Sequence, residues 1–128
     1  MKLADKTALV TGASKGIGAA LAIGLAREGA DVAVNYHDDR DGAEAVADVI
    51  REMGRDAIVI RADISDVDAI YGMFAAVREH FGRLDVLINN AGITGWTDLF
   101  EITQEKWDHV INTNMRGTFF CSLEAARM

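Results

Sequence analysis

The sequence predicts an α/β fold in which helices cover both faces of a parallel β-sheet. Two observations carry this prediction. Short apolar runs recur along the 128 residues at intervals of 24, 26 and 27 residues, centred on Leu9, Ala33, Val59 and Val86. The stretches between these runs have the periodicity of amphipathic helices. Alternating strands and helices form parallel sheets with right-handed crossovers, so we expect a sheet that is covered on both sides.

The expected strands are continuous runs of β-branched and aliphatic residues, which is typical of strands buried on both faces. They cover residues 7–10 (TALV), 31–35 (DVAVN), 57–61 (AIVIR) and 84–89 (LDVLIN). Numbered along the chain, these strands are expected to pair in the order 3-2-1-4.

The three intervals between the strands each predict one helix with an apolar face. The faces consist of Ile17, Leu21 and Leu25 in the first helix; Ala43, Val46, Ala47, Ile50 and Met53 in the second; and Val67, Ile70, Tyr71, Phe74, Val77 and Phe81 in the third. Gly29, Gly54 and Gly82 follow the three helices as stop signals. Ser65 and Asp68 offer a capping box to the third helix.

The remainder of the chain changes character after Asn89. A loop (AGITGWTDLFEI) leads to helical sequence that is capped by Thr103 and runs toward the C-terminus. We expect Trp96 and Trp107 to pack against neighbouring residues rather than contact a substrate, and Cys121 to be buried. No linker divides the chain, which predicts a single nucleotide-binding domain over residues 1–128.

Composition excludes several classes of protein. Half of the residues are hydrophobic, a quarter are charged and none is proline, which excludes collagen-like and disordered chains. The net charge of −7 repels phosphate backbones and anionic lipid, so nucleic acid and membranes are not expected partners. A lone cysteine and the lack of a long apolar N-terminal stretch predict a reducing, cytoplasmic location.

A glycine-rich segment directly follows the first expected strand. Residues 11–18 read TGASKGIG, and the first helix begins within them. Glycines let the backbone turn tightly and approach a ligand, while the helix N-terminus attracts an anion. A P-loop requires four residues between its glycines, whereas three separate Gly12 from Gly16, so a P-loop NTPase is excluded. The segment therefore predicts a pyrophosphate site in a Rossmann-like, dinucleotide-binding fold.

Four motifs together resemble those of the short-chain dehydrogenases/reductases. They are TGASKGIG, Asp63 in RADIS after the third strand, NNAG at 89–92 after the fourth strand, and Thr113–Asn114 in VINTNMRGTFF. They occur in the family's order, span the whole chain and are most similar to the branch that includes glucose dehydrogenases and 3-oxoacyl-carrier-protein reductases. The resemblance implies hydride transfer between a nicotinamide dinucleotide and a small alcohol or carbonyl substrate.

The resemblance also implies roles for individual residues, each just beyond the C-terminal end of an expected strand or in the later helix. The implied cofactor-binding residues are Gly12, Ser14, Lys15, Gly16, Ile17 and Gly18 at the pyrophosphate and adenosine ribose, Tyr36 and His37 after the second strand, Asp63 and Ile64 beside the adenine, Asn90, Ala91 and Gly92 along the nicotinamide ribose, and Thr113. Asn114 is implied to hold a water for proton relay. His37, His80 and His109 lack metal-ligand spacing, so no metal site is expected.

Structural roles remain open for some of these residues. Asn89 and Asn90 could tie backbone groups after a strand, and Asp63 could cap the loop that leads into Ser65. Asparagine is unfavourable inside helical sequence, so Asn114 either distorts its helix to bind water or marks a break.

The choice of cofactor depends on the end of the second strand. NAD-specific enzymes place an acidic residue there to accept the ribose hydroxyls, and basic residues accommodate the extra phosphate of NADP. The position is occupied by Tyr36, followed by His37, and Lys15 lies in the glycine turn. These residues favour NADP(H) over NAD(H), although Asp38 and Asp39 would repel a phosphate if they turned inward.

The family's proton donor is the tyrosine of a Tyr-x-x-x-Lys pair. Tyr36 is followed four residues later by Arg40, and Tyr71 by Ala75, so neither tyrosine fits. We expect the family's pair and its later strands to be missing from these residues, of which Met128 is the last. The chain alone would then be inactive, and one edge of its fourth strand would be uncovered. An uncovered edge favours homo-oligomers. The alternative is a non-catalytic nucleotide-binding or assembly module.

Overall fold

The computed structural model of the chain describes residues 1–93 and 98–128. Within these ranges, the strands form a four-stranded parallel sheet with the order β3-β2-β1-β4, which confirms the predicted order. The strands are β1 (Thr7–Val10), β2 (Asp31–Tyr36), β3 (Ala57–Arg61) and β4 (Val86–Ile88). The helical elements are α1 (Gly16–Arg27), α2 (Arg40–Glu52), α3 (Val67–Phe81), the 3-10 turn η1 (Leu99–Glu101), α4 (Gln104–Ile111), the π-helix η2 (Asn112–Gly117) and α5 (Thr118–Ala126).

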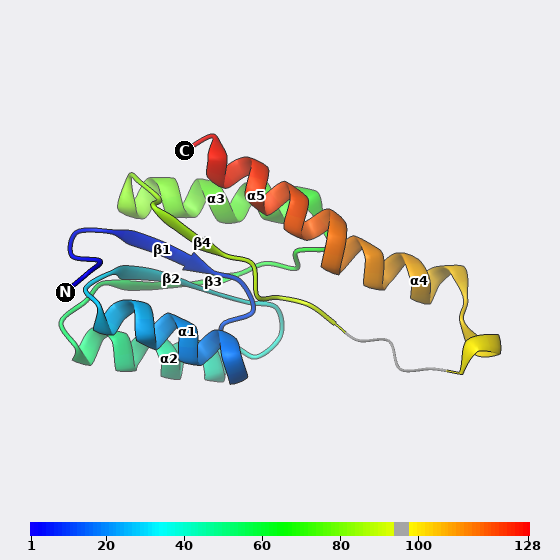
Figure 1. Cartoon of the computed structure of the whole chain (residues 1–128), viewed down its shortest axis with the longest axis horizontal. Coiled ribbons are helices and arrows are strands. Elements are labelled where there is room, and N and C mark those ends of the chain that lie inside the picture. Colours follow the sequence, from blue (N-terminus) through cyan, green and yellow to red (C-terminus); the bar gives the residue numbers. More distant parts are fainter. Residues whose placement is uncertain (94–97) are drawn as a thin grey trace.

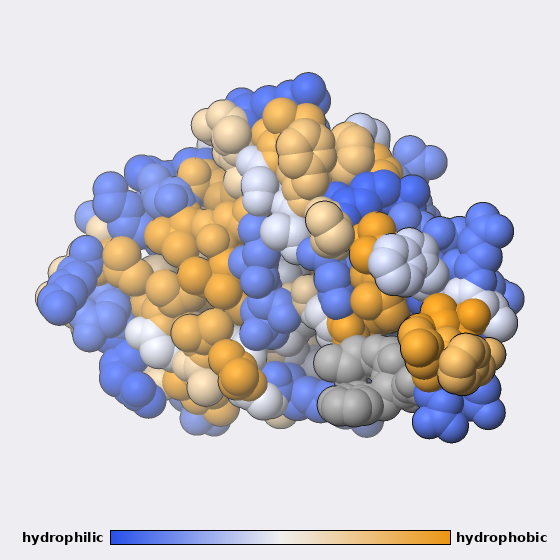
Figure 2. Space-filling view, turned by 45° about the vertical axis from the view of Figure 1, so that its right-hand side comes forward, coloured by the Kyte–Doolittle hydropathy of each residue, from blue (hydrophilic) through white to orange (hydrophobic). Residues whose placement is uncertain are grey.

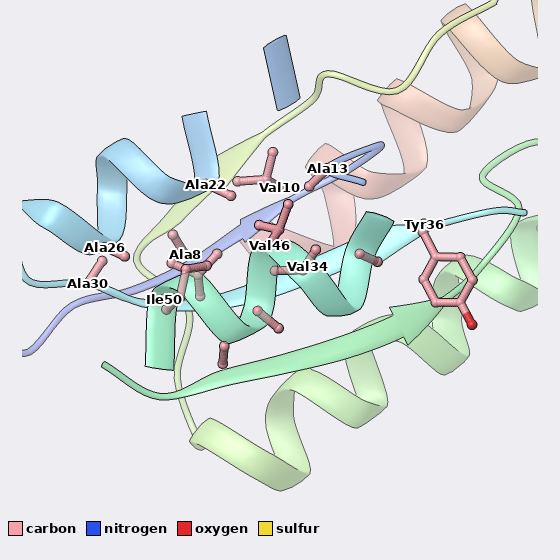
Figure 3. Close-up of a cluster of buried hydrophobic side chains, with 14 residues drawn as sticks. Ala8, Val10, Ala13, Ala22, Ala26, Ala30, Val34, Tyr36, Val46 and Ile50 are labelled. Atoms are coloured by element: carbon pink, nitrogen blue, oxygen red, sulfur yellow. The ribbon is translucent and has the colours of Figure 1, made fainter. Parts of the chain in front are cut away.

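The sheet lies between two helical layers, with α1 and α2 on one face and α3 and α5 on the other (Figure 1). Successive strand residues point to opposite faces of the sheet, so β1 contributes side chains to the contacts with both helical layers. Ala8 and Val10 join the apolar cluster under α1 and α2, which Figure 3 shows, whereas Leu9 joins the cluster under α3 and α5. This arrangement confirms the predicted Rossmann-like class.

Helix α1 packs on the sheet through small residues. Gly18, Ala22 and Ala26 are its buried positions. The predicted apolar face is wrong for Ile17 and Leu21, because both side chains are exposed, Ile17 to 74%. Small residues let the helix approach the strands closely, so Ile17 and Leu21 stay exposed while Ile23 and Leu25 pack against the edge of the cluster.

The start of α3 differs from the predicted capping box of Ser65 and Asp68. The cap is Asp66, whose carboxylate accepts hydrogen bonds from the N–H groups of Asp68 and Ala69. Ser65 cannot serve, because its hydroxyl donates to the Asp63 carboxylate at 2.7 Å. Aspartate is as good an N-cap as serine, so a shift of one residue costs nothing.

The bounds of two strands also differ slightly from the prediction. Strand β2 includes Tyr36, one residue beyond the predicted end, and β4 covers only the centre of the predicted range 84–89. The exposed edge expected for β4 is reflected in its burial, since Val86, Leu87 and Ile88 are each only partly buried.

Helix α4, the π-helix η2 and helix α5 follow one another without a break and form one long helical rod. The Thr103 hydroxyl oxygen accepts a hydrogen bond from the Lys106 N–H at 3.1 Å, which confirms the predicted cap. Helix α4 buries none of its residues and extends beyond the sheet (Figure 1). Trp107 is 59% exposed, so the expectation that it packs is wrong, and Trp96 lies outside the described residues. Cys121 in α5 is buried, as predicted.

Apolar side chains stay exposed along this rod and the turn before it. They are Leu99, Phe100, Ile102, Trp107, Met115 and Phe119. Figure 2 shows apolar groups on the surface it presents, separated by hydrophilic ones. Among residues 1–93 and 98–128, no helix has both the length and the apolar character that crossing a bilayer requires.

Candidate functional site

A pocket of about 320 Å³ opens at the carboxyl ends of the strands, where ligands bind in open α/β sheets. Its walls come from the loops after β1, β2, β3 and β4 and from η2. The lining residues are Gly12, Ser14, Lys15, Asn35, His37, Asp38, Ala62, Asp63, Ile64, Asn90, Ala91, Gly92, Ile93 and Thr113.

The glycine turn depends on two close backbone approaches. Gly12 has a φ of +60°, and a Cβ atom there would lie 2.9 Å from the Cα of Ala91. A Cβ atom on Gly18 would overlap the Gly12 carbonyl oxygen and the side-chain amide of Asn90. Both positions therefore require glycine for steric reasons, independently of any ligand.

The first turn of α1 differs in its capping from the first turns of α2, α3 and α4. Its N-cap residue, Lys15, makes no side-chain cap hydrogen bond, whereas Asp39, Asp66 and Thr103 cap α2, α3 and α4. The space above Gly16 is open, with no atom within 4 Å of a Cβ built there. Free N–H groups facing open space, at the positive end of a helix dipole, suit a diphosphate.

Asn35 connects the glycine turn to two strands, a role that the sequence analysis missed. Its Oδ1 accepts from the Gly12 N–H at 3.1 Å, and its Nδ2 donates to the carbonyl oxygens of Ile60 and Ala62, both at 3.2 Å. The Ala13 N–H donates to the Asn35 backbone carbonyl at 2.8 Å. A polar residue in the otherwise apolar run of β2 was the available signal.

The NNAG segment after β4 is tied to the same turn. Asn90 donates from Nδ2 to the carbonyl oxygens of Thr11 and Gly12, at 3.2 and 3.0 Å. The Thr11 hydroxyl oxygen accepts from the backbone N–H groups of Asn90 and Ala91, both at 3.0 Å. Asn89 points elsewhere and donates to the Ser122 hydroxyl at 3.0 Å. Asn90 therefore has the backbone-tying role left open above and also lines the pocket.

Asp63 lines the same pocket from the loop after β3. Its Oδ1 accepts from the N–H and the hydroxyl of Ser65, and its Oδ2 lies 3.6 Å from Nε2 of His37. Burial of Asp63 raises its pKa, but the hydrogen bonds from Ser65 and the nearby rings of His37 and His109 outweigh burial. The pKa of Asp63 therefore lies below its ordinary value of 3.8, and the carboxylate is charged at neutral pH.

Asn114 lies within η2 and binds backbone rather than another side chain. Its Oδ1 accepts from the Ile93 N–H at 2.9 Å and its Nδ2 donates to the Ile93 carbonyl at 2.7 Å. Of the two structural outcomes weighed for this residue, a distorted helix is the one observed. Asn114 sits beside Gly92, outside the lining residues, whereas Thr113 lines the pocket and donates to the His109 carbonyl.

The loop that carries Asp63 contacts η2. Arg116 donates from Nη2 to the Ser65 carbonyl, and Gly117 packs against the Ile64 carbonyl so tightly that a Cβ atom would collide with it. The wall proposed for adenine and the segment that holds Asn114 are thus joined directly.

Not every residue named from the sequence reaches the pocket. Tyr36 is buried at the end of β2, in the cluster under α1 and α2, as Figure 3 shows. Gly16, Ile17 and Gly18 belong to the first turn of α1 beside the pocket but are not among its lining residues. Within the part of the chain that the structure describes, no three His, Cys, Asp or Glu side chains are grouped to hold a metal ion.

Comparison with known proteins agrees with this geometry. The sequence profile of the family described as short chain dehydrogenase matches residues 6–128. Versicolorin reductase stcU of Emericella nidulans is 46% identical over 126 residues, which are 98% of this chain and 48% of that protein. The 3-oxoacyl-(acyl-carrier-protein) reductase FabG of Staphylococcus aureus is 48% identical over 120 residues, which are 94% of this chain and 49% of that protein.

Solved structures give the same result. A short chain dehydrogenase from Burkholderia cenocepacia in complex with NADP superposes with a TM-score of 0.97 at 45% identity, covering 99% of this chain and 52% of that one. A short-chain dehydrogenase/reductase from Serratia marcescens superposes with a TM-score of 0.95 at 40% identity, covering 99% of this chain and 52% of that one. The chain spans about half the length of these relatives. From the profile match over nearly its whole length, the chain belongs to the short-chain dehydrogenase family.

Proposed function

We propose that the chain forms the cofactor-binding part of an NAD(P)-dependent oxidoreductase that acts on a small alcohol or carbonyl substrate. The observation that carries the proposal is that the glycine turn, Asp63 and the NNAG segment line one pocket. When bound, the dinucleotide supplies a nicotinamide carbon that exchanges hydride with the substrate carbon.

The proposed binding roles follow from the position of each group. The uncapped first turn of α1, from Gly16 onward, would donate N–H groups to the diphosphate. Asp63 would accept hydrogen bonds from the adenine amino group, because its carboxylate is charged and lies at the pocket wall. Ala91 and Gly92 would line the nicotinamide ribose, and Asn114 would fix that wall through its two bonds to Ile93 and hold a water for proton relay.

NADP(H) is the proposed cofactor in preference to NAD(H). Lys15 and His37 both line the pocket, while the strand-end position typical of NAD-specific enzymes is occupied by the buried Tyr36 rather than by a carboxylate. Asp38 also lines the pocket and opposes a phosphate. A homo-oligomer is proposed from the apolar side chains exposed along α4, η2 and α5.

Binding is tested by titrating the purified 128-residue chain with NADPH and following cofactor fluorescence. The Gly16→Val variant should weaken affinity by about tenfold or more, because its side chain would fill the open space proposed for the diphosphate. Gly54→Val is the matched control, since Gly54 also has positive φ and open space but lies at the end of α2, away from the pocket. Equal loss of affinity in both variants would contradict the proposal.

Turnover by the chain alone tests whether the missing pair is required. The 128 residues contain no Tyr-x-x-x-Lys pair, so we propose that the chain alone oxidises NADPH little or not at all with ketones and aldehydes. Robust turnover would show that the pair is dispensable. Binding without turnover fits both the proposed cofactor-binding part and a non-catalytic nucleotide-binding module, whereas failure to bind any nicotinamide dinucleotide would leave the assembly module.

A further inference from the structure

Ser65 links the pocket-lining carboxylate of Asp63 to the π-helix η2. On one side, the N–H and the hydroxyl of Ser65 donate to Oδ1 of Asp63 at 2.9 and 2.7 Å. On the other side, the Ser65 carbonyl oxygen accepts a hydrogen bond from Nη2 of Arg116. Arg116 therefore reaches the Asp63 carboxylate through one intervening residue, although it is not among the residues that line the pocket.

The loop after β3 is held on η2 by two adjacent contacts. Arg116 provides a charged donor, and a charged donor makes a stronger hydrogen bond than a neutral one. Within residues 1–93 and 98–128, no carboxylate forms an ion pair with the Arg116 guanidinium group, so none competes with the Ser65 carbonyl for it. The next residue, Gly117, lies so close to the Ile64 carbonyl that a Cβ atom there would overlap it.

The same π-helix also holds the loop after β4. Asn114 binds the backbone N–H and carbonyl of Ile93, at 2.9 and 2.7 Å. Arg116 thus bonds to the loop proposed to contact adenine, and Asn114 bonds to the loop proposed to line the nicotinamide ribose. Removal of the Arg116 side chain should therefore affect the adenine end of the cofactor more than the nicotinamide end.

We propose that Arg116 is a positioning residue for the cofactor: by holding the Ser65 carbonyl, it keeps the Asp63 carboxylate directed at the adenine amino group. The inference rests on the proposed function, because it assumes a dinucleotide in this pocket with its adenine beside Asp63. Since Ser65 is bonded to both groups, loss of the arginine bond releases Ser65 and Asp63 together. Hydrogen bonds weaken steeply when they are misaligned, so a carboxylate that is free to shift binds the amino group less well.

The base of the cofactor provides a readout that separates this role from a general structural one. Adenine offers an amino group, whereas hypoxanthine carries a carbonyl oxygen at the same position, which a carboxylate repels. The unaltered chain should therefore bind NADPH more tightly than reduced nicotinamide hypoxanthine dinucleotide phosphate. The ratio of the hypoxanthine to the adenine dissociation constant measures how well Asp63 recognises the base.

The experiment titrates the unaltered chain and Arg116→Met with both cofactors and follows cofactor fluorescence. Arg116 is exposed, so the variant should keep the circular dichroism spectrum and the urea midpoint of the unaltered chain. We expect the ratio to fall by about threefold to fivefold, a modest change because the hydrogen bond is exposed and acts through a second residue.

Arg127→Met is the matched control. Arg127 lies on the same rod at the end of α5, where it pairs with Glu124 at 2.9 Å, and it is not among the residues that line the pocket. Its ratio should stay within about twofold of the unaltered value, because exposed ion pairs contribute little.

A second comparison tests whether Arg116 acts through Asp63. Asp63→Ala should lower the ratio by itself, because it removes the carboxylate that recognises the amino group. Addition of Arg116→Met to Asp63→Ala should then lower the ratio no further, since the group that the arginine positions is absent. A further fall in the double variant, as large as that caused by Arg116→Met alone, would overturn the inference.

Two other results would overturn the inference while leaving the proposed function intact. One is an unchanged ratio in Arg116→Met, including the case in which both cofactors lose affinity equally. The other is an unaltered chain that binds both cofactors with the same affinity, because Asp63 would then not recognise the amino group. If neither cofactor binds although circular dichroism shows a folded chain, the proposed function fails, and the inference fails with it.

Discussion

The side chain of Asn35 accepts a hydrogen bond from the backbone N–H of Gly12 at 3.1 Å, 23 residues earlier in the chain. Asn35 is almost fully buried, and its Nδ2 also donates to the carbonyl oxygens of Ile60 in β3 and of Ala62 just after that strand. One side chain thus sets the glycine turn in position against both β2 and the end of β3.

Replacement of Asn35 by leucine should destabilise the fold strongly. Leucine has a similar volume but removes the side-chain partner of the Gly12 N–H and the donor to two carbonyl groups, at an expected loss of about 3 kcal/mol of unfolding free energy. Urea denaturation followed by circular dichroism measures this loss. Asn89→Leu is the control: Asn89 is exposed and has a single bond to Ser122, so its loss should stay below about 1 kcal/mol. Similar losses would refute the role given to Asn35.

Two glycines of α1 should respond in opposite directions to alanine. Gly18→Ala places a methyl group against the Gly12 carbonyl and the Asn90 amide, so we expect a loss of about 2 kcal/mol. Gly24→Ala meets no atom within 4 Å and gains helix propensity, so we expect a gain of about 0.5–1 kcal/mol. Thermal unfolding of the two variants gives the comparison, and a stable Gly18→Ala variant would contradict the close packing of α1.

The thiol of Cys121 should be unreactive in the folded chain. Burial raises the pKa of Cys121 to about 11, so little thiolate exists at pH 8, and α3 and α5 shield the sulfur. Labelling with a chromogenic disulfide reagent at pH 8 should be slow in buffer and complete in denaturant. Rapid labelling under native conditions would mean that α5 separates readily from α3.

Asp63 should make stability depend on acidity. Its folded-state pKa lies below the ordinary value of 3.8, so its stabilising contribution is present above that value and is lost as the pH falls through the folded-state pKa. Asp63→Asn should therefore be less stable than the unaltered chain at pH 7, and the difference should shrink below about pH 3. Urea midpoints at both pH values provide the test. A difference that stays constant with pH would mean that the Asp63 charge adds nothing to stability.

Much of the fold could be predicted because its signals are local. The apolar runs set the strands, and the glycine turn marks the junction of β1 and α1. The same reasoning failed for Ile17 and Leu21, since hydropathy favours large apolar side chains in the core, whereas close packing selected Gly18 and Ala22. The distance between a helix and a sheet is a tertiary property that hydropathy does not report.

Only part of the candidate site could be predicted from the sequence. His37 and Asp63 could each be named from their strands, but the short distance between them depends on the pairing of β2 with β3. Tyr36 was assigned to the pocket because it ends a strand, yet strand alternation turns its side chain into the core. For Asn114 the sequence left a distorted helix or a break as alternatives, and its partner Ile93, 21 residues earlier, could not be identified.

The wide turn of η2 rotates the side chains of α5 about the helix axis relative to those of α4. A π-turn holds one residue more than an α-turn, and each residue of an α-helix advances by about 100°, so the turn offsets the side chains of α5 from the directions that an unbroken helix would give them. This offset accompanies a rod in which α4 buries nothing while α5 buries Cys121 against α3. With α4 held in place, an unbroken α-helix of the same sequence would therefore rotate Cys121 by about 100° from its present direction, away from α3.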